Sequence, residues 1–151
     1  MFLRNYVPSD IEDVVKLFCD TVRSVNASDY TRKQIAAWAP LDIDVREWQA
    51  SFSGRYALVA VENGVLVGFG DIDETGYLDR LYVHKDHQRE GIATALCEKL
   101  ERAVTGRRIR VHASITARPF FEKRGYRVLK EQKVKRHGVF LTNFIMEKTA
   151  E

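Results

Sequence analysis

The sequence predicts an α/β domain of the α+β type, with a mixed, mostly antiparallel sheet, a central parallel pair of strands and flanking helices. Three observations indicate this class. Helical patterns precede three consecutive strands, and two strand–helix–strand units follow, around helices at 91–104 and 116–123. The chain has 151 residues, of which 45% are hydrophobic, which is enough for one apolar core. No repeat or linker divides it, so we expect residues 1–151 to form a single domain.

The N-terminal region is predicted to contain a short strand and an amphipathic helix. Residues 2–7 can form the strand, which ends before Pro8. Ser9 and Glu12 have the spacing of a capping box, in which two side chains satisfy free N–H groups at the start of a helix. Apolar residues then recur at helical spacing as far as about residue 25, which predicts a helix over that segment.

Two shorter helices are expected before the first long strand. Asp29 and Thr31 can cap one of them, and Pro40 stops it. Asp44 can open the other, which runs to Phe52.

The middle of the chain changes to β-branched and apolar runs, and Asn63-Gly64 between the first two runs is a strong hairpin signal. A turn at 74–76 leads into a third strand. The predicted elements from this point are strands at 56–62, 65–73 and 77–83, a helix at 91–104 ended by Gly106, a strand at 109–113, a helix at 116–123, and strands at 126–134 and 139–147 joined by a turn at Gly138.

The composition favours a local anion site over a nucleic-acid or membrane surface. The net charge is +3 and the pI about 8.9, without the clustered basic face expected of a nucleic-acid-binding protein. No apolar run approaches the roughly 20 residues of a membrane-spanning helix. Cys19 and Cys97 lie in helical patterns and cannot make a disulfide framework. We therefore expect a reduced, cytoplasmic monomer or homodimer without a signal peptide and with no nucleic acid or membrane partner.

The loop before the helix at 91–104 has the features of a phosphate site. A helix N-terminus offers four free backbone N–H groups and a partial positive charge. Small residues let a pyrophosphate approach these amides, and the polar side chains beside them can add donors. From these residues alone, the alternative to a phosphate site is an ordinary start of a helix. The segment consists of Gln88, Arg89, Glu90, Gly91, Ile92, Ala93 and Thr94.

Two segments together resemble a known family. Residues 78–83 (LDRLYV) followed by 88–93 (QREGIA) are similar to the acetyl-coenzyme A motif of the GNAT N-acetyltransferases, Q/R-x-x-G-x-G/A at the start of a long helix. Residues 117–126 (ARPFFEKRGY) are similar to the second cofactor segment of that family, which ends in Gly-Phe or Gly-Tyr. The resemblance covers about residues 56–147.

The resemblance implies an acetyl-CoA-dependent N-acetyltransferase with acetyl-CoA as co-substrate and no metal. Residues 77–126 would form the cofactor-binding core. The strand at Leu81, Tyr82 and Val83 would bind the pantetheine arm through its backbone, and the amides of 88–94 would hold the pyrophosphate. The remaining cofactor positions that the resemblance implies are Ser114, Phe120, Phe121 and Lys123.

The transfer needs a base, because an amine attacks only when it is neutral. Asp79 is the first candidate: by two-residue alternation it shares a face or an edge register with Tyr77, Leu81 and Val83, and a carboxylate inside such an apolar strand is costly unless it is paired or functional. A structural ion pair is the equal alternative. The family often carries its base at the position of Tyr77, which is a departure here. His112 is the second candidate because its ordinary pKa suits a base, with a structural histidine as the alternative.

The acid is missing from its usual place. The family often has a tyrosine four residues before the glycine of the second segment, where this chain has Phe121. Among the available phenols Tyr30 ranks first, because the N-terminal helices can reach over the sulfur. Tyr30, Trp38 and Trp48 are also the expected walls of an acceptor pocket in the N-terminal third, with core packing as the alternative.

Three function hypotheses follow. The first is transfer of acetyl to a primary amine of a small molecule or a protein, by direct attack. The others are a non-catalytic acyl-CoA sensor and an enzyme that acetylates aminoacyl-tRNA. His84 and His87 lie three residues apart beside Asp86, a spacing that suggests a metal, but the sequence offers no further ligand cluster and we expect a solvated loop.

Overall fold

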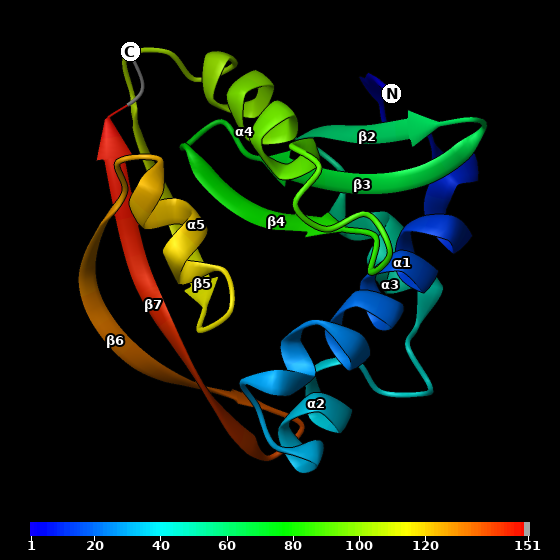
Figure 1. Ribbon diagram of the computed structural model, residues 1–151, viewed down its shortest axis with the longest axis vertical. Helices are drawn as coiled ribbons and strands as arrows, with labels where there is room; N and C mark the ends of the chain where they lie inside the picture. The colour runs from blue at the N-terminus through cyan, green and yellow to red at the C-terminus, as the bar shows by residue number, and fades with distance from the viewer. Residues whose placement is uncertain (150–151) are drawn as a thin grey trace.

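A computed structural model describes residues 1–149 and places seven strands in one sheet, in the order β1-β2-β3-β4-β5-β7-β6 (Figure 1). All neighbouring strands are antiparallel except β4 and β5, which confirms the predicted fold class. The elements in chain order are β1 (Phe2–Asn5), the 3-10 turn η1 (Pro8–Asp10), α1 (Ile11–Ser24), the 3-10 turn η2 (Asn26–Ser28), α2 (Arg32–Trp38), α3 (Val45–Ser51), β2 (Tyr56–Glu62), β3 (Val65–Ile72), β4 (Tyr77–Val83), α4 (Ile92–Arg102), β5 (Arg108–Ser114), α5 (Arg118–Lys123), β6 (Arg127–Arg136) and β7 (Val139–Thr149).

The start of α1 differs from the predicted capping box. Ser9 lies inside the 3-10 turn, and the neighbouring Asp10 accepts the Val7 N–H at 2.9 Å. Asp10 also accepts two hydrogen bonds from the Arg4 guanidinium, each at 2.8 Å. A carboxylate can neutralise that cation and satisfy the backbone at once, which a serine hydroxyl cannot do. The capping box from Ser9 to Glu12 is therefore wrong.

The caps of the two short helices are confirmed in part. Thr31 and Gln34 form a reciprocal capping box on α2, and the Asp44 carboxylate accepts the Arg46 N–H at 3.0 Å at the start of α3. Asp29 does not cap α2, because its carboxylate accepts a hydrogen bond from the hydroxyl of Thr116 instead.

The protein has two apolar cores. Helix α4 is the main helix of one core, and helix α1 is the main helix of the other. The α4 side buries Leu96 and Leu100, and the α1 side buries Val14 and Phe18. Helix α4 lies close to β3, where a Cβ on Gly68 would stand 2.8 Å from the Ile92 side chain. The missing side chain at Gly68 therefore sets how near the start of α4 can approach the sheet.

Strand β4 contains a β-bulge and diverges from its neighbour β5, and these two features determine where a cleft can form. It pairs with β5 only at Tyr77 and Leu78, and beyond these residues the two strands diverge (Figure 1). On its other side, Asp71 pairs with Arg80 while Ile72 pairs with Leu78, so Asp79 is one extra residue in β4. Such a β-bulge interrupts the alternation of side chains.

The bulge corrects the predicted face assignment. Leu78, Leu81 and Val83 belong to the α4 core, whereas Tyr82 belongs to the α1 core. Leu81 and Val83 share a face as predicted, but the extension of that face to Tyr77 and Asp79 is wrong, because the extra residue shifts the register within β4.

The C-terminal hairpin of β6 and β7 extends along β5 to the region of α2 (Figure 1). The hydroxyl of Tyr30 donates to the carbonyl of Thr142 at 2.7 Å, and Gln34 donates to the carbonyl of Phe140. Both contacts tie the N-terminal helices to the far end of this hairpin. Among residues 1–149, no helix has the length and apolar character needed to cross a membrane.

Candidate active site

A cleft of about 630 Å³ lies where β4 and β5 diverge. It is bounded by the diverging strands, the start of α4, helix α5 and the segment from the end of α1 through η2 to α2. The predicted residues that line it are Trp38, Asp79, Leu81, Tyr82, Val83, Gln88, Arg89, Gly91, Ile92, Ala93, Thr94, His112, Ser114, Phe120 and Phe121. The fold thus brings most of the predicted site together.

The edge of β4 that faces this cleft carries backbone groups without a strand partner. The His84 N–H donates to the Val67 carbonyl on β3 at 2.8 Å. The backbone N–H and carbonyl groups of successive residues in a strand point to opposite edges. Those of Leu81 and Val83 therefore face away from β3, toward the cleft. The Val83 carbonyl accepts from the Thr21 hydroxyl at 2.9 Å and from Gln88 Nε2 at 2.8 Å. Leu81 therefore offers the more accessible backbone groups.

Helix α4 begins at the cleft with the geometry of an anion site. Gly91 is the N-cap residue with φ 84°, in the left-handed region, and its carbonyl accepts the first helical bond from Ala95. Residues 91–94 line the cleft, so the free N–H groups of the first turn face it. A side chain at Gly91 would strain this backbone. The left-handed conformation is therefore a second reason for glycine at this position, beside its predicted role of leaving room for phosphate. Gln88 binds the loop's own carbonyls through Nε2, so its side chain braces the loop.

A buried network of charges stands behind the bulge. The fully buried Asp71 carboxylate accepts the Arg80 N–H at 3.0 Å and pairs with the Arg80 guanidinium at 2.5 Å. Arg55 bridges Asp71 and Asp79 through ion pairs. Burial raises the pKa of Asp71, while Arg80 and Arg55 act in the opposite direction. The ion-pair alternative for Asp79 is thus realised, with Arg55 as its partner, and the carboxylate still lines the cleft.

His112 lies on β5 across the cleft from the bulge. Its ring centroid lies 5.1 Å from that of Tyr77. Partial burial, with a smaller contribution from Arg110, lowers the pKa of His112 below its ordinary value of 6.5, so the imidazole is neutral at pH 7. Burial, together with the charge of Asp79, raises the pKa of Tyr77 to about 12. His112 therefore offers a neutral imidazole to the cleft at pH 7.

Several predicted residues lie elsewhere. Tyr30 lines a separate cavity of about 390 Å³, and its hydroxyl accepts the Ile115 N–H at 2.9 Å while donating to Thr142. This placement argues against Tyr30 as the acid, because its one proton is already donated to a backbone carbonyl. Trp48 packs on Phe18 with ring centroids 4.6 Å apart, which favours the core-packing alternative.

Two further residues of the predicted cofactor set do not line the cleft. Lys123 is exposed near the end of α5. Glu90 is also exposed, and its carboxylate lies 3.1 Å from His87 Nδ1. Their side chains therefore do not contribute to the cleft wall.

Some lining residues escaped the sequence analysis. Thr21, Val25, Asn26 and Ser28 form the wall contributed by the end of α1 and by η2, and the other such residues are Leu78, His87, Val111, Ala113, Thr116 and Ala117. Small polar residues after a helix are common in loops, so no signal in the sequence distinguishes them.

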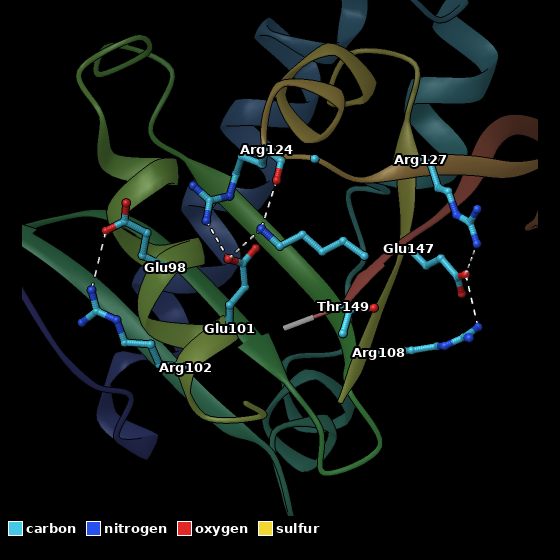
Figure 2. Close-up of a pocket in the computed structure, with 10 residues that line it drawn as sticks. Glu98, Glu101, Arg102, Arg108, Arg124, Arg127, Glu147 and Thr149 are labelled. Carbon is cyan, nitrogen blue, oxygen red and sulfur yellow. Dashed lines mark hydrogen bonds and ion pairs between the residues drawn. The ribbon is translucent and has the colours of Figure 1, made fainter. Parts of the chain in front are cut away.

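A second cavity, of about 610 Å³, lies between α4, the end of α5 and the strands β5, β6 and β7. Figure 2 shows that its charged side chains face one another: Glu98 meets Arg102, and Glu147 lies between Arg108 and Arg127. The deeper Glu101 pairs with Arg124 at 2.7 Å. None of the predicted site residues lines this cavity.

Comparisons with known proteins agree with this architecture. The profile of the family described as Acetyltransferase (GNAT) domain matches residues 26–148. The uncharacterized N-acetyltransferase YafP of Escherichia coli is 36% identical over 144 residues, covering 95% of this chain and 93% of its own. The crystal structure of a GCN5-related N-acetyltransferase from Rhodopseudomonas palustris superposes with a TM-score of 0.92 at 33% identity, over 98% of this chain and 94% of that one.

A more distant structure shares the fold. The PaiA N-acetyltransferase of Thermoplasma acidophilum, solved in complex with coenzyme A, gives a TM-score of 0.75 at 19% identity, with 98% of each chain covered. Together the sheet, the cleft and these relatives define an N-acetyltransferase. The chain belongs to the GNAT acetyltransferase family, as the resemblance of its two motifs predicts.

Proposed function

We propose that this enzyme transfers the acetyl group of acetyl-CoA directly to a primary amine of a small molecule or a protein. One observation carries the proposal: the open edge of β4 and the free amides of α4 meet in a single cleft. An extended amide chain can pair with the first, and a pyrophosphate can bind the second. The pantetheine arm and the diphosphate of coenzyme A have this chemistry in this order. The PaiA N-acetyltransferase, which shares this fold, was solved in complex with coenzyme A.

The cofactor is held mainly by backbone groups. The amides of Gly91, Ile92, Ala93 and Thr94 bind the pyrophosphate at the positive end of α4. The N–H and carbonyl of Leu81 bind the pantetheine arm, as a neighbouring strand would. Residues 120 and 121 of α5 (both Phe) flank the thioester end.

The acetyl transfer uses groups on both β4 and β5, the two strands that diverge at the cleft. The neutral amine attacks the thioester carbonyl carbon, and His112 takes its proton directly or through one water molecule. Backbone N–H groups on the open edge of β4 stabilise the oxyanion. The C–S bond then breaks, and the sulfur leaves as a thiolate, whose ordinary pKa of about 8.5 makes an enzymic acid dispensable.

Asp79 has a different part. Its carboxylate forms an ion pair with the Arg55 guanidinium and lines the cleft. Asp79 attracts the acceptor as an ammonium ion, which releases one proton to solvent before the neutral amine attacks and gives its second proton to His112. Direct proton transfer to Asp79 is the second possibility that the cleft supports.

A panel of amines tests this function. The enzyme is incubated with acetyl-CoA and, separately, polyamines, amino acids, aminoglycosides and peptides, and the release of free thiol is followed. Turnover with at least one class supports the proposal. Saturable binding of coenzyme A without thiol release by any acceptor would contradict it and favour the sensor hypothesis. Salt-sensitive activity restricted to aminoacyl-tRNA would favour the third hypothesis.

A further inference from the structure

Three side chains from separate parts of the chain converge beside the phosphate loop. Glu62 ends β2, and His87 and Glu90 lie in the loop before α4. His87 Nδ1 lies 3.3 Å from an oxygen of Glu62 and 3.1 Å from an oxygen of Glu90. Within residues 1–149, this is the one group of three or more potential metal ligands whose donor atoms all lie within 4.8 Å of one another.

These distances match the geometry of a small divalent ion. Ligand atoms at about 2.0–2.2 Å from a tetrahedral zinc ion lie about 3.3 Å apart. A single Nδ1–H can satisfy only part of the hydrogen-bonding capacity of two carboxylates, and the two anions repel each other across the ring nitrogen. A cation bound by all three groups relieves this repulsion.

We propose that Glu62, His87 and Glu90 bind one divalent transition-metal ion, with zinc as the preferred ion. An imidazole ligand disfavours Mg²⁺ and Ca²⁺, which prefer oxygen. A neutral imidazole and two carboxylates carry two negative charges, which balance those of the ion. Three protein ligands leave a fourth position open to water or an exogenous ligand. Glu62, 25 positions before His87 in the chain, would supply the ligand that the local sequence around His84 and His87 lacks.

The position of this site gives the ion a structural consequence. His87 lines the cofactor cleft, and Glu90 precedes the N-cap residue Gly91. An ion that joins Glu62 to both therefore ties the β2–β3 hairpin to the phosphate loop. It also neutralises the carboxylate of Glu90 next to amides that attract anions.

Zinc binding by the full chain without cofactor tests the site directly. Isothermal calorimetry with Zn²⁺ is expected to give saturation at one ion per chain, and Co²⁺ should give the visible absorption of a tetrahedral site. His87→Ala should weaken binding by about 100-fold or more, because one of three ligands is lost. Glu90→Gln should weaken it by at least about 10-fold, and because Glu90 is exposed this variant keeps the fold intact.

The matched control is His84→Ala. This histidine lies three residues away, its Nδ1 accepts the Asp86 N–H, and it is not part of the converging group. Zinc affinity in this variant should equal that of the native chain. No saturable binding of Zn²⁺ by the native chain, or equal affinity after His87→Ala, would overturn the proposal.

Discussion

The two large cavities of this enzyme have nearly equal volumes and opposite chemistry. The cleft between β4 and β5 measures about 630 Å³, and the cavity of Figure 2 about 610 Å³. The first presents unpaired backbone groups and a helix N-terminus, which need an outside partner. The second is lined largely by arginines and glutamates that form ion pairs with one another, as between Glu101 and Arg124. Unsatisfied backbone, and not volume, therefore identifies the cofactor site.

The comparison is tested most severely at the N-cap of α4. Gly91→Glu should weaken coenzyme A binding about 1000-fold, because a carboxylate would stand against the pyrophosphate and like charges cost several kcal/mol. Gly91→Ala is the control for backbone strain. At φ 84° it should cost about 1–2 kcal/mol of stability and leave affinity within a few fold. Calorimetric titration of both variants with coenzyme A is the measurement, and equal affinities would contradict the assignment.

The proton acceptor of the cleft should show in a pH profile. Because the pKa of His112 is lowered, kcat/KM should rise with pH and level off with an apparent pKa below 6.5. His112→Ala should lower turnover by about 100-fold or more and remove this acidic limb. His84→Ala should preserve both the turnover rate and the rise of kcat/KM with pH. If His112→Ala keeps near-native turnover and the same rise of kcat/KM with pH, then Asp79 and not His112 is the proton acceptor.

The ion network behind the cleft should matter for stability. Asp71→Asn removes the buried charge that balances Arg80 and Arg55, which should cost about 3 kcal/mol or more of the free energy of unfolding. Asp20→Asn breaks an exposed pair with Lys16 and should cost less than about 1 kcal/mol. Urea unfolding of the two variants measures the difference. Equal losses would show that Asp71 is not an anchor of β4.

The two cysteines should be dispensable for turnover. Cys97 is fully buried, and burial next to Glu101 raises the pKa of its thiol to about 12. Burial also raises the pKa of Cys19. Neither is available as a thiolate, so direct transfer predicts that the double variant Cys19→Ala, Cys97→Ala keeps kcat within about twofold. The steady-state rate checks this, and a folded but inactive double variant would indicate an acetyl-cysteine intermediate.

The smallest effect is expected in the cavity of Figure 2. Arg127 is 74% exposed and shares Glu147 with Arg108. Arg127→Ala should leave coenzyme A affinity unchanged and lower stability by less than about 1 kcal/mol, because exposed ion pairs contribute little. A clear loss of affinity in a calorimetric titration would give this cavity a part in cofactor binding.

Local patterns in the sequence predicted the fold class, whereas the loop before α4 was assigned to the cofactor through the resemblance of two segments to a known family. Helical and strand periodicity gave the element order, and the small residues at Gly91 and Ala93 indicated the helix N-terminus that lines the cleft. The bulge at Asp79 was not predictable, because alternation assumes that each residue pairs in turn. It depends instead on the register between β3 and β4.

Contacts between distant residues account for the other differences. The partner of Asp79 is Arg55, 24 residues earlier, and Tyr30 is held by Thr142 at the other end of the chain. Neither pair leaves a signal in the local sequence. The sequence therefore left open whether Asp79 is paired and did not indicate that the Tyr30 hydroxyl has a partner, and the fold supplies partners for both.

An NMR titration with coenzyme A tests the central claim most directly, since it observes each backbone amide in both cavities at once. The account predicts that the amide signals of Leu81, Gly91 and Ala93 shift with one saturating affinity, while those of Arg127 and Glu147 in the cavity of Figure 2 stay in place. Shifts confined to the charged cavity, with the amides of β4 and α4 unmoved, would contradict it.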